Sequence, residues 1–426
     1  MSHDFNIKDD ARRRSTDQLQ NFREANDGAV AWDTEAPADF TFLFDPDHVL
    51  VRASAVEAFE RAVEATRDIF DGELTRAEDS VPGYLARYRL PTRRNDFTVP
   101  EVVTELRRVG DFPPGDVTPD HWVHVAPGGG TLCPAIEPEE TGHKKPWPPV
   151  HDDATDDKRK PVQVSVVDTG WHPPAGTDPR TPWLHGVQGD DELNDPDLRE
   201  YAGHGTFIAG IVRCLAPHTD IYVEGFAIGG FGGGGMLESA VIAQMDEALD
   251  HDPRVINLSA GCRTHDDYPS LAFEVFYETR LKDRDCVLVA AAGNDSSPAP
   301  FWPAAAPWAV GVGSLDRDGR VSSYSNYGVS ADVYALGRNI INAFPDGTFT
   351  CQETPNKGDV RVFGTGMARW SGTSFSAPVV AGLIAREIYE SGSSADAAAQ
   401  AVLATAQYMS DPAIGPLQAL RQPYDS

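Results

Sequence analysis

Two patterns of apolar and polar positions follow one another along this chain. From residue 161 onward, short continuous apolar runs alternate with longer segments of helical periodicity. Continuous apolar runs are typical of strands buried on both faces, and their alternation with helices predicts a parallel sheet. We therefore predict an α/β fold in which helices cover both faces of the sheet. The predicted strands are 162–167, 221–223, 255–258, 287–291 and 309–312, and the predicted helices are 206–215, 236–249, 271–280, 378–390 and 395–406.

A shorter region before residue 128 shows a different pattern. Strand-like segments alternate with amphipathic helices, and there is room for one more strand. This order predicts a small α+β domain over residues 41–127. The expected strands are 48–52, 84–90 and 122–125, and the expected helices are 55–69 and 101–109.

The remaining segments lack a clear period. Residues 1–40 are polar and charged, and we expect them to be poorly ordered. Residues 128–160 are rich in proline, glycine and charge, which predicts a linker before the α/β domain at 161–410. Residues 411–426 follow the last predicted helix as a C-terminal tail.

Charge and cysteine content narrow the classes of partner and compartment. The 426 residues carry a formal net charge of −29, which argues against binding to nucleic acid or to anionic membranes. No apolar run reaches the length of a membrane span, and the first residues lack the apolar stretch of a secretory signal. The five cysteines are odd in number and show no metal-ligand spacing. These features predict a cytoplasmic protein.

Four polar residues stand where such a sheet would gather them. Asp168 and Asn294 end apolar strands, His204 lies between two glycines before a helix, and Ser374 follows a Gly-Thr pair at the start of another helix. Taken singly, they also fit an Asx turn, a structural histidine and a helix N-cap. Taken together, they supply a nucleophile (Ser374), a base (His204) and a carboxylate (Asp168) that orients the base.

The segments around these residues resemble motifs of the subtilisin-like serine peptidases (subtilases). They are Val-Val-Asp-Thr-Gly at 166–170, Gly-His-Gly-Thr at 203–206, Ala-Ala-Gly-Asn at 291–294 and Ser-Gly-Thr-Ser-x-Ser-x-Pro at 371–378. The resemblance covers roughly residues 160–410 and follows the chain order of subtilisin. It implies a subtilisin-like parallel sheet and a serine endopeptidase that acts through an acyl-enzyme, with Asn294 and the Ser374 N–H stabilising the oxyanion.

Two residues depart from the commonest family pattern. Phe375 stands where methionine is usual, and Ser376 stands where alanine is usual. The serine motif also fits the sedolisins, which act in acid, but His204 and Asn294 argue against that relationship. Activity is therefore expected near neutral or alkaline pH.

A substrate-binding segment is implied by the same resemblance. Asn257-Leu258-Ser259-Ala260-Gly261 resembles the strand on which an extended peptide pairs through main-chain hydrogen bonds. The small residues in this region predict an open pocket with a large apolar or broad preference before the scissile bond, unless they only pack the sheet. The expected substrate-binding residues are Ser259, Ala260, Gly261, Ala291, Ala292 and Gly293.

The region 41–127 resembles the ferredoxin-like prodomain of many subtilases by pattern and position. The resemblance implies an intramolecular inhibitor of the peptidase, whose other partner is a peptide or protein substrate. A small accessory domain remains the alternative for this region. For the whole chain, the alternatives are an inactive or permanently inhibited protein that binds peptides in the same cleft, and a processing protease for one dedicated partner.

No cofactor is required for the expected chemistry, and no residue is assigned to a metal. Structural calcium is common in the family. Carboxylates at Asp190, Asp191, Glu192, Asp195 and Asp197 offer ligands for it, although they show no recognisable ligand spacing. A solvated acidic loop is the favoured interpretation of these residues.

Overall fold

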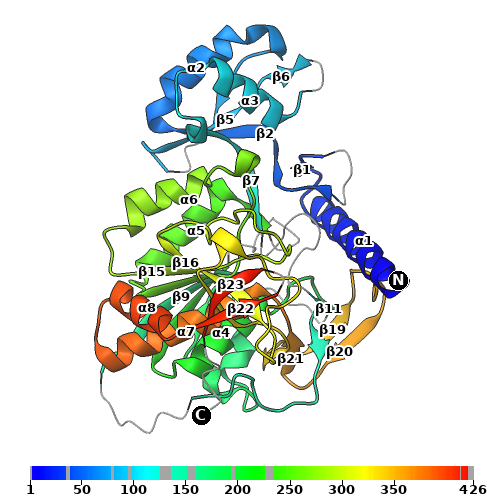
Figure 1. The fold of residues 1–426 in the computed structure, drawn as a ribbon, viewed down its shortest axis with the longest axis vertical. Coiled ribbons are helices and arrows are strands. Elements are labelled where there is room, and N and C mark those ends of the chain that lie inside the picture. The colour runs from blue at the N-terminus through cyan, green and yellow to red at the C-terminus, as the bar shows by residue number, and fades with distance from the viewer. Residues whose placement is uncertain are drawn as a thin grey trace.

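The computed structural model describes residues 2–34, 39–77, 81–94, 97–124, 136–151, 159–192, 197–225, 235–412 and 414–420. These residues form a small N-terminal part, at the top of Figure 1, and a larger part that carries the predicted site residues. A long first helix, α1 (Ser2–Ala25), contacts both parts. Among the described residues, no helix combines the length and the apolar character needed to cross a bilayer.

The larger part is built on a parallel sheet. In the described chain its strand order is β10-β12-β9-β14-β15-β16-β17-β23-β22. Neighbours from β10 to β23 run parallel, and β22 closes one edge as the antiparallel partner of β23. The strands are β9 (Val162–Asp168), β10 (Gln188–Gly189), β12 (Thr219–Gly225), β14 (Val255–Leu258), β15 (Val287–Ala291), β16 (Ala309–Leu315), β17 (Val333–Leu336), β22 (Gln407–Asp411) and β23 (Gly415–Ala419).

Helices cover both faces of this sheet, as predicted. Val166 and Val167 are consecutive in β9, so their side chains enter the two separate apolar cores on opposite faces. One core holds α4 (His204–Leu215), α7 (Thr373–Ser391) and α8 (Ala395–Ala404). The other holds α5 (Glu238–Asp250) and α6 (Leu271–Phe276), which continues as a π-helical turn to Leu281.

The N-terminal part has the α+β character predicted for it. Its antiparallel strands lie in the order β7-β2-β5-β4, and α2 and α3 pack into the same apolar core as the sheet. Its identity as a ferredoxin-like prodomain stays a prediction. The elements are β2 (Leu43–Arg52), α2 (Val56–Ala65), β4 (Thr75–Arg76), β5 (Leu85–Arg89), α3 (Val99–Val109) and β7 (Val117–His124).

One strand of the larger part extends this N-terminal sheet. β13 (Gly235–Leu237) pairs antiparallel with β7, so the sheet crosses the boundary between the two parts. The remaining short strands are β1 (Ala31–Trp32), β3 (Phe70–Asp71), β6 (Thr92–Arg93), β8 (Glu139–Glu140), β11 (Asp197–Leu198), β18 (Ile340–Ala343), β19 (Gly347–Thr350), β20 (Val360–Phe363) and β21 (Met367–Trp370).

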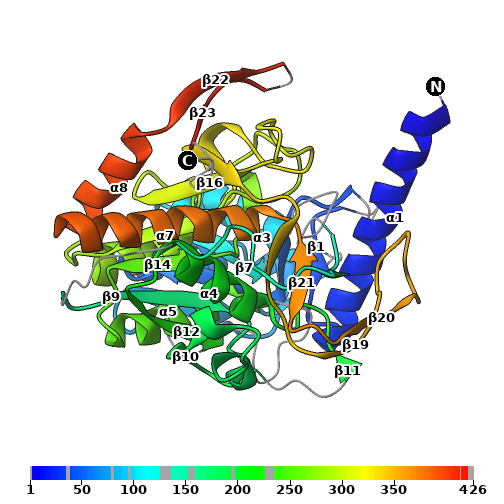
Figure 2. The same ribbon diagram turned by 90° about the horizontal axis from the view of Figure 1, so that it is seen from below.

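The prediction of a poorly ordered N-terminus at residues 1–40 is wrong for most of that range. α1 is a helix, and Leu19 and Phe22 on it are buried against Trp122 and Leu237. Figure 2 shows α1 alongside the hairpin of β19 and β20, where Arg14 contacts Glu353 at 2.5 Å. Two apolar residues hold α1 in place because they pack against residues from distant parts of the chain, and the local sequence pattern does not show this contact.

Two predicted boundaries also need correction. The tail predicted at 411–426 begins inside the hairpin of β22 and β23, where Leu417 and Ala419 are buried beside Tyr334. Within the predicted linker at 128–160, residues 136–151 are fixed to the larger part by β8, which pairs with β21. Residues 128–135, 152–158 and 421–426 lie outside the described residues.

Candidate active site

Ser374 and Asn294 are brought together by the start of α7. Ser374 is the second residue of that helix, and its neighbour Thr373 donates its backbone N–H to Oδ1 of Asn294 at 2.8 Å. The Oγ of Ser374 lies 3.4 Å from the carbonyl oxygen of Ser259. In return, the Oγ of Ser259 donates to the carbonyl of Ser374 at 2.8 Å. The serine therefore lies at a helix N-terminus and beside the amide predicted to bind an oxyanion.

His204 and Asp168 form a buried pair. Asp168 ends β9, His204 begins α4, and Nδ1 of His204 lies 2.7 Å from Oδ1 of Asp168. Nε2 of His204 is buried and has no hydrogen-bond partner among the residues that the structure describes. Because the carboxylate accepts at Nδ1, the proton lies on that nitrogen and Nε2 is left as the basic one.

The backbone before His204 is held by Glu192, which the sequence offers only as a possible calcium ligand. Gly203 has φ 76°, a left-handed conformation that favours glycine at this turn into α4. Its N–H donates to both carboxylate oxygens of Glu192, at 3.0 and 2.8 Å. Glu192 thus positions the first turn of the helix that carries His204.

Aromatic rings pack around the imidazole of His204. Trp370 meets it edge-on with ring centres 5.3 Å apart, and Phe375 lies 5.2 Å away. Phe375, one of the two residues that depart from the commonest family pattern, makes this contact with the imidazole. The rings restrict His204 to the orientation that its bond to Asp168 requires.

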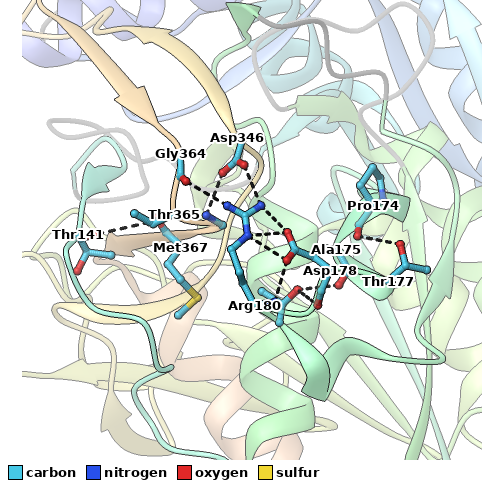
Figure 3. Close-up of polar contacts among 12 residues, drawn as sticks. Thr141, Pro174, Ala175, Thr177, Asp178, Arg180, Asp346, Gly364, Thr365 and Met367 are labelled. Atoms are coloured by element: carbon cyan, nitrogen blue, oxygen red, sulfur yellow. Dashed lines mark hydrogen bonds and ion pairs between the residues drawn. The ribbon is translucent and has the colours of Figure 1, made fainter.

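Figure 3 shows how the segment leading to Trp370 is tied to the loop after β9. The guanidinium of Arg180 contacts Asp178 in its own loop, Asp346 at 2.8 Å and the carbonyl of Gly364 at 3.1 Å. The backbone N–H of Gly366 also donates to Asp346 at 2.9 Å. Since Arg180 is 43% exposed, these contacts orient the segment more than they stabilise it.

The predicted substrate-binding segment already pairs with a strand of the same chain. The N–H and carbonyl of Gly261 exchange hydrogen bonds with the carbonyl and N–H of His124, both at 3.1 Å. On its other side, His124 pairs with Gly235 of β13. The end of β7 therefore lies between two segments of the larger part, as an extended peptide would.

The six small residues do not leave an open pocket, which corrects that expectation. A Cβ built on Gly261 would lie 2.4 Å from the ring of Phe301, and one built on Gly293 would lie 3.0 Å from it. The fully buried ring of Phe301 occupies the space beside both glycines. Ala260, Ala291 and Ala292 are buried in the sheet cores or beside them.

Asn326 supports the loop after Asn294. Asn326 accepts the backbone N–H groups of Asp295 and Ser297, at 2.9 and 3.0 Å, and donates to the carbonyl of Ala292 at 2.9 Å. Burial raises the pKa of the Asp295 carboxyl to about 7. The sequence analysis assigns no role to Asn326, although the Ser-Asn-Tyr-Gly segment at 325–328 is a possible signal.

The acidic loop whose carboxylates offer calcium ligands is partly engaged in other contacts. Asp190 accepts the N–H of Gly225 at 2.9 Å, and Glu192 accepts that of Gly203. Asp195 lies outside the described residues. Across the described ranges, no group of three or more histidine, cysteine, aspartate or glutamate side chains has an arrangement suited to a metal ion.

Comparison with known proteins agrees with the fold. The sequence model of the subtilase family matches residues 159–418, and the chain belongs to that family. It is 33% identical over 237 residues to the "Thermophilic serine proteinase" of Bacillus sp. (strain AK1), covering 52% of this chain and 51% of that protein. This chain thus matches about half the length of that relative.

Two other similar proteins extend this comparison. Subtilisin Savinase of Lederbergia lenta is 27% identical over 235 residues, which cover 53% of this chain and 75% of that protein. The crystal structure of fervidolysin from Fervidobacterium pennivorans, described as a keratinolytic enzyme related to subtilisin, aligns with a TM-score of 0.54 at 18% identity. That alignment covers 90% of this chain and 62% of fervidolysin, and it bears on the fold alone.

Proposed function

We propose that this protein is a serine endopeptidase whose nucleophile is Ser374, whose base is His204 and whose orienting carboxylate is Asp168. The observation that carries this proposal is the 2.7 Å contact between His204 and Asp168, beside the helix that begins with Thr373 and Ser374. The family membership and the serine proteinases among its relatives support the same chemistry.

The reaction follows from these positions. Ser374 exchanges its contact with the Ser259 carbonyl for one with Nε2 of His204, gives up its proton and attacks the peptide carbonyl. Asp168 stabilises the imidazolium that forms, and His204 then protonates the leaving amine. Water hydrolyses the resulting acyl-enzyme by the reverse sequence of proton transfers.

The oxyanion of the tetrahedral intermediate is assigned to Nδ2 of Asn294 and the N–H of Ser374. Asn294→Ala is expected to lower kcat on the order of 10²–10³-fold with little change in KM, the magnitude known from subtilisin. Steady-state kinetics of the two proteins, with thermal unfolding to check the fold, measures this. A change of less than threefold would remove Asn294 from the mechanism.

We further propose that the N-terminal part restrains the enzyme by filling its substrate cleft with β7. His124 pairs with both Gly235 and Gly261, and its bridge to Gly261 is antiparallel. The C-terminal end of β7 therefore faces the Ser259 side, where Ser374 lies. Ser374, His204 and Asp168 are all buried in the full chain. This burial supports the proposal that the N-terminal part restrains the enzyme.

Labelling by a fluorophosphonate probe tests both proposals. We expect slow labelling of the full chain that disappears in Ser374→Ala. Val123→Asp should accelerate it, because Val123 is fully buried and packs in the same core as Ala260 and Leu258. Val109→Asp is the matched control, since Val109 is a 38% exposed valine of the same N-terminal part.

A protein that binds peptides without cleaving them is the second candidate. It is favoured by the depth at which β7 is anchored, with Asp120, His121 and Val123 all buried. Absence of Ser374-dependent labelling in both the full chain and Val123→Asp would favour this candidate over the peptidase.

The side chain preferred before the scissile bond is proposed to be small. Phe301 occupies the space beside Gly261 and Gly293, which supports a narrow pocket in place of the broad one expected from sequence. We keep structural calcium and a cytoplasmic location as proposals that rest on the sequence alone.

A further inference from the structure

The side chain of His121 leaves β7 and enters the larger part of the molecule. Its Nδ1 lies 2.6 Å from Oε1 of Glu238, at the start of α5, and both side chains are fully buried. The same carboxylate oxygen also accepts the backbone N–H of His121 at 3.1 Å. Glu238 therefore binds both the backbone and the side chain of one residue of the bound strand.

The opposite edge of the imidazole is also recognised. The backbone N–H of His265 donates to Nε2 of His121 at 3.1 Å. Nε2 must be the accepting nitrogen, so Nδ1 carries the proton and donates to Glu238. The cavity thus presents an acceptor to one ring nitrogen and a donor to the other, which matches a neutral imidazole. A lysine or arginine side chain would direct its own N–H groups toward the N–H of His265.

The Glu238 carboxylate, which binds the imidazole through Oε1, is held in place by hydrogen bonds to its second oxygen. Oε2 of Glu238 accepts the hydroxyl of Ser270 and the backbone N–H of Ala272, the latter at 3.4 Å. All these groups lie between residues 238 and 272 of the larger part. From the N-terminal part, the ring of Phe42 meets the imidazole edge-on with ring centres 5.7 Å apart, and it takes no part in these hydrogen bonds.

The register of β7 relates this cavity to the cleft. Trp122, Val123 and His124 pair with Leu237, Met236 and Gly235 of β13, and His124 also pairs with Gly261. An extended peptide bound in this register places its residue in the cavity three positions before the one that pairs with Gly261. The cavity is therefore reached by any chain that binds as β7 does.

We propose that Glu238, Ser270 and the backbone N–H of His265 form a subsite that selects histidine in peptide substrates, three positions before the residue paired with Gly261. This inference rests on the proposed function, because it takes β7 to occupy the cleft in the manner of a substrate. It extends the substrate class to extended peptides with a His-x-aliphatic-x sequence, as in His121-Trp122-Val123-His124.

The test uses the full chain with His121→Ala, which empties the cavity, and Val123→Asp, which is expected to take β7 out of the cleft. Internally quenched peptides carry the sequence of residues 121–126 followed by a common tail, with histidine, alanine, glutamine, phenylalanine or lysine at the first position. We expect kcat/KM for the histidine peptide to exceed that for the alanine and lysine peptides on the order of 10–100-fold, the effect of a hydrogen bond to a buried charged group.

Substitution of the carboxylate provides the second arm. When Glu238→Leu is added to this double variant, the preference for histidine should disappear and kcat/KM for the phenylalanine peptide should rise. When Glu238→Gln is added instead, which keeps the shape of the side chain, the preference should fall partway. Each result is a ratio of the kcat/KM values of two peptides measured with the same protein. A general loss of activity therefore cancels.

The outcomes separate the subsite from the proposed function. Hydrolysis of all peptides with a histidine-to-alanine ratio near one overturns the subsite and leaves the peptidase intact. If Ser374 is labelled but no peptide is cleaved, the same ratios are measured as inhibition of labelling. If Ser374 is not labelled and no peptide is hydrolysed, the proposed function is overturned. The proposed histidine subsite then falls with it.

Discussion

At the scale of single residues, the site combines groups that sequence motifs identify with groups that only tertiary contacts reveal. Asp168, His204, Asn294 and Ser374 each follow from a short motif at a strand end or helix start, and the structure brings them to one edge of the sheet. Phe301 has no such motif. Its importance comes from the ring filling the space beside Gly261 and Gly293, which are distant from each other in sequence.

Phe301 supplies a prediction about specificity. Phe301→Val should open the space beside the two glycines, so cleavage after phenylalanine or leucine should rise about tenfold relative to cleavage after alanine. Peptide series that vary only the residue before the scissile bond measure this ratio. Phe276→Val is the matched control, because Phe276 is an equally buried ring in the core on the α5 and α6 side. An unchanged ratio in Phe301→Val would show that the ring does not border the pocket.

At the scale of elements, α1 is a helix that the sequence pattern does not predict. Its stripe consists of Leu19 and Phe22 within a charged segment, which by composition favours disorder. The ring of Phe22 nonetheless packs edge-on against Trp122 of β7 at 5.2 Å and lies directly over Gly235 of β13. A helix that covers the pairing of β7 with β13 should keep β7 in the cleft.

Truncation of that ring tests the helix. Phe22→Ala removes packing worth about 3–5 kcal/mol, so β7 should leave the cleft more often and Ser374 should be labelled at least about tenfold faster. Glu24→Ala is the control, because Glu24 lies on the exposed side of the same helix. Labelling rates of the three proteins at equal concentration decide the question. Equal rates for Phe22→Ala and the parent would mean that α1 does not hold the strand.

At the scale of the whole molecule, carboxyl groups gather where α1 meets the larger part. Glu353 is buried and bound by Arg14 and Gln18 of α1. Burial, and then the charge of Glu353, raises the pKa of Glu137 to about 7 and that of Glu200 to about 8. The folded chain therefore keeps protons on Glu137 and Glu200 at pH values where the unfolded chain has released them.

This arrangement predicts how stability changes with pH. A raised pKa in the folded state means that stability is greatest below the ordinary value of 4.5 and is lost as the pH rises through about 7 and 8. The thermal midpoint of the full chain should fall between pH 5 and pH 9, since both groups then ionise beside Glu353. Glu137→Gln/Glu200→Gln should show a flatter profile. Parallel profiles for the two proteins would exclude these carboxyl groups as the cause.

The parts of the architecture that could be predicted differ from the rest in one physical respect. The parallel sheet and its helices follow from local periodicity, because each buried strand is apolar along its own length, as in β15. The hairpin of β22 and β23 was missed because β22 is mostly exposed and has no apolar alternation. The cavity for His121 was missed because Glu238, His265 and Ser270 meet only in the fold.

Because β7 pairs with β13 of the same chain, the restraint of the enzyme should not depend on dilution until the chain is cut. While the chain is continuous, the covalent connection gives β7 a high effective concentration at the cleft, whatever the concentration of the protein. A cut between His124 and the larger part would turn the same strand into a separate ligand. Its occupancy would then obey mass action, so the restraint would weaken as the solution is diluted and return as it is concentrated.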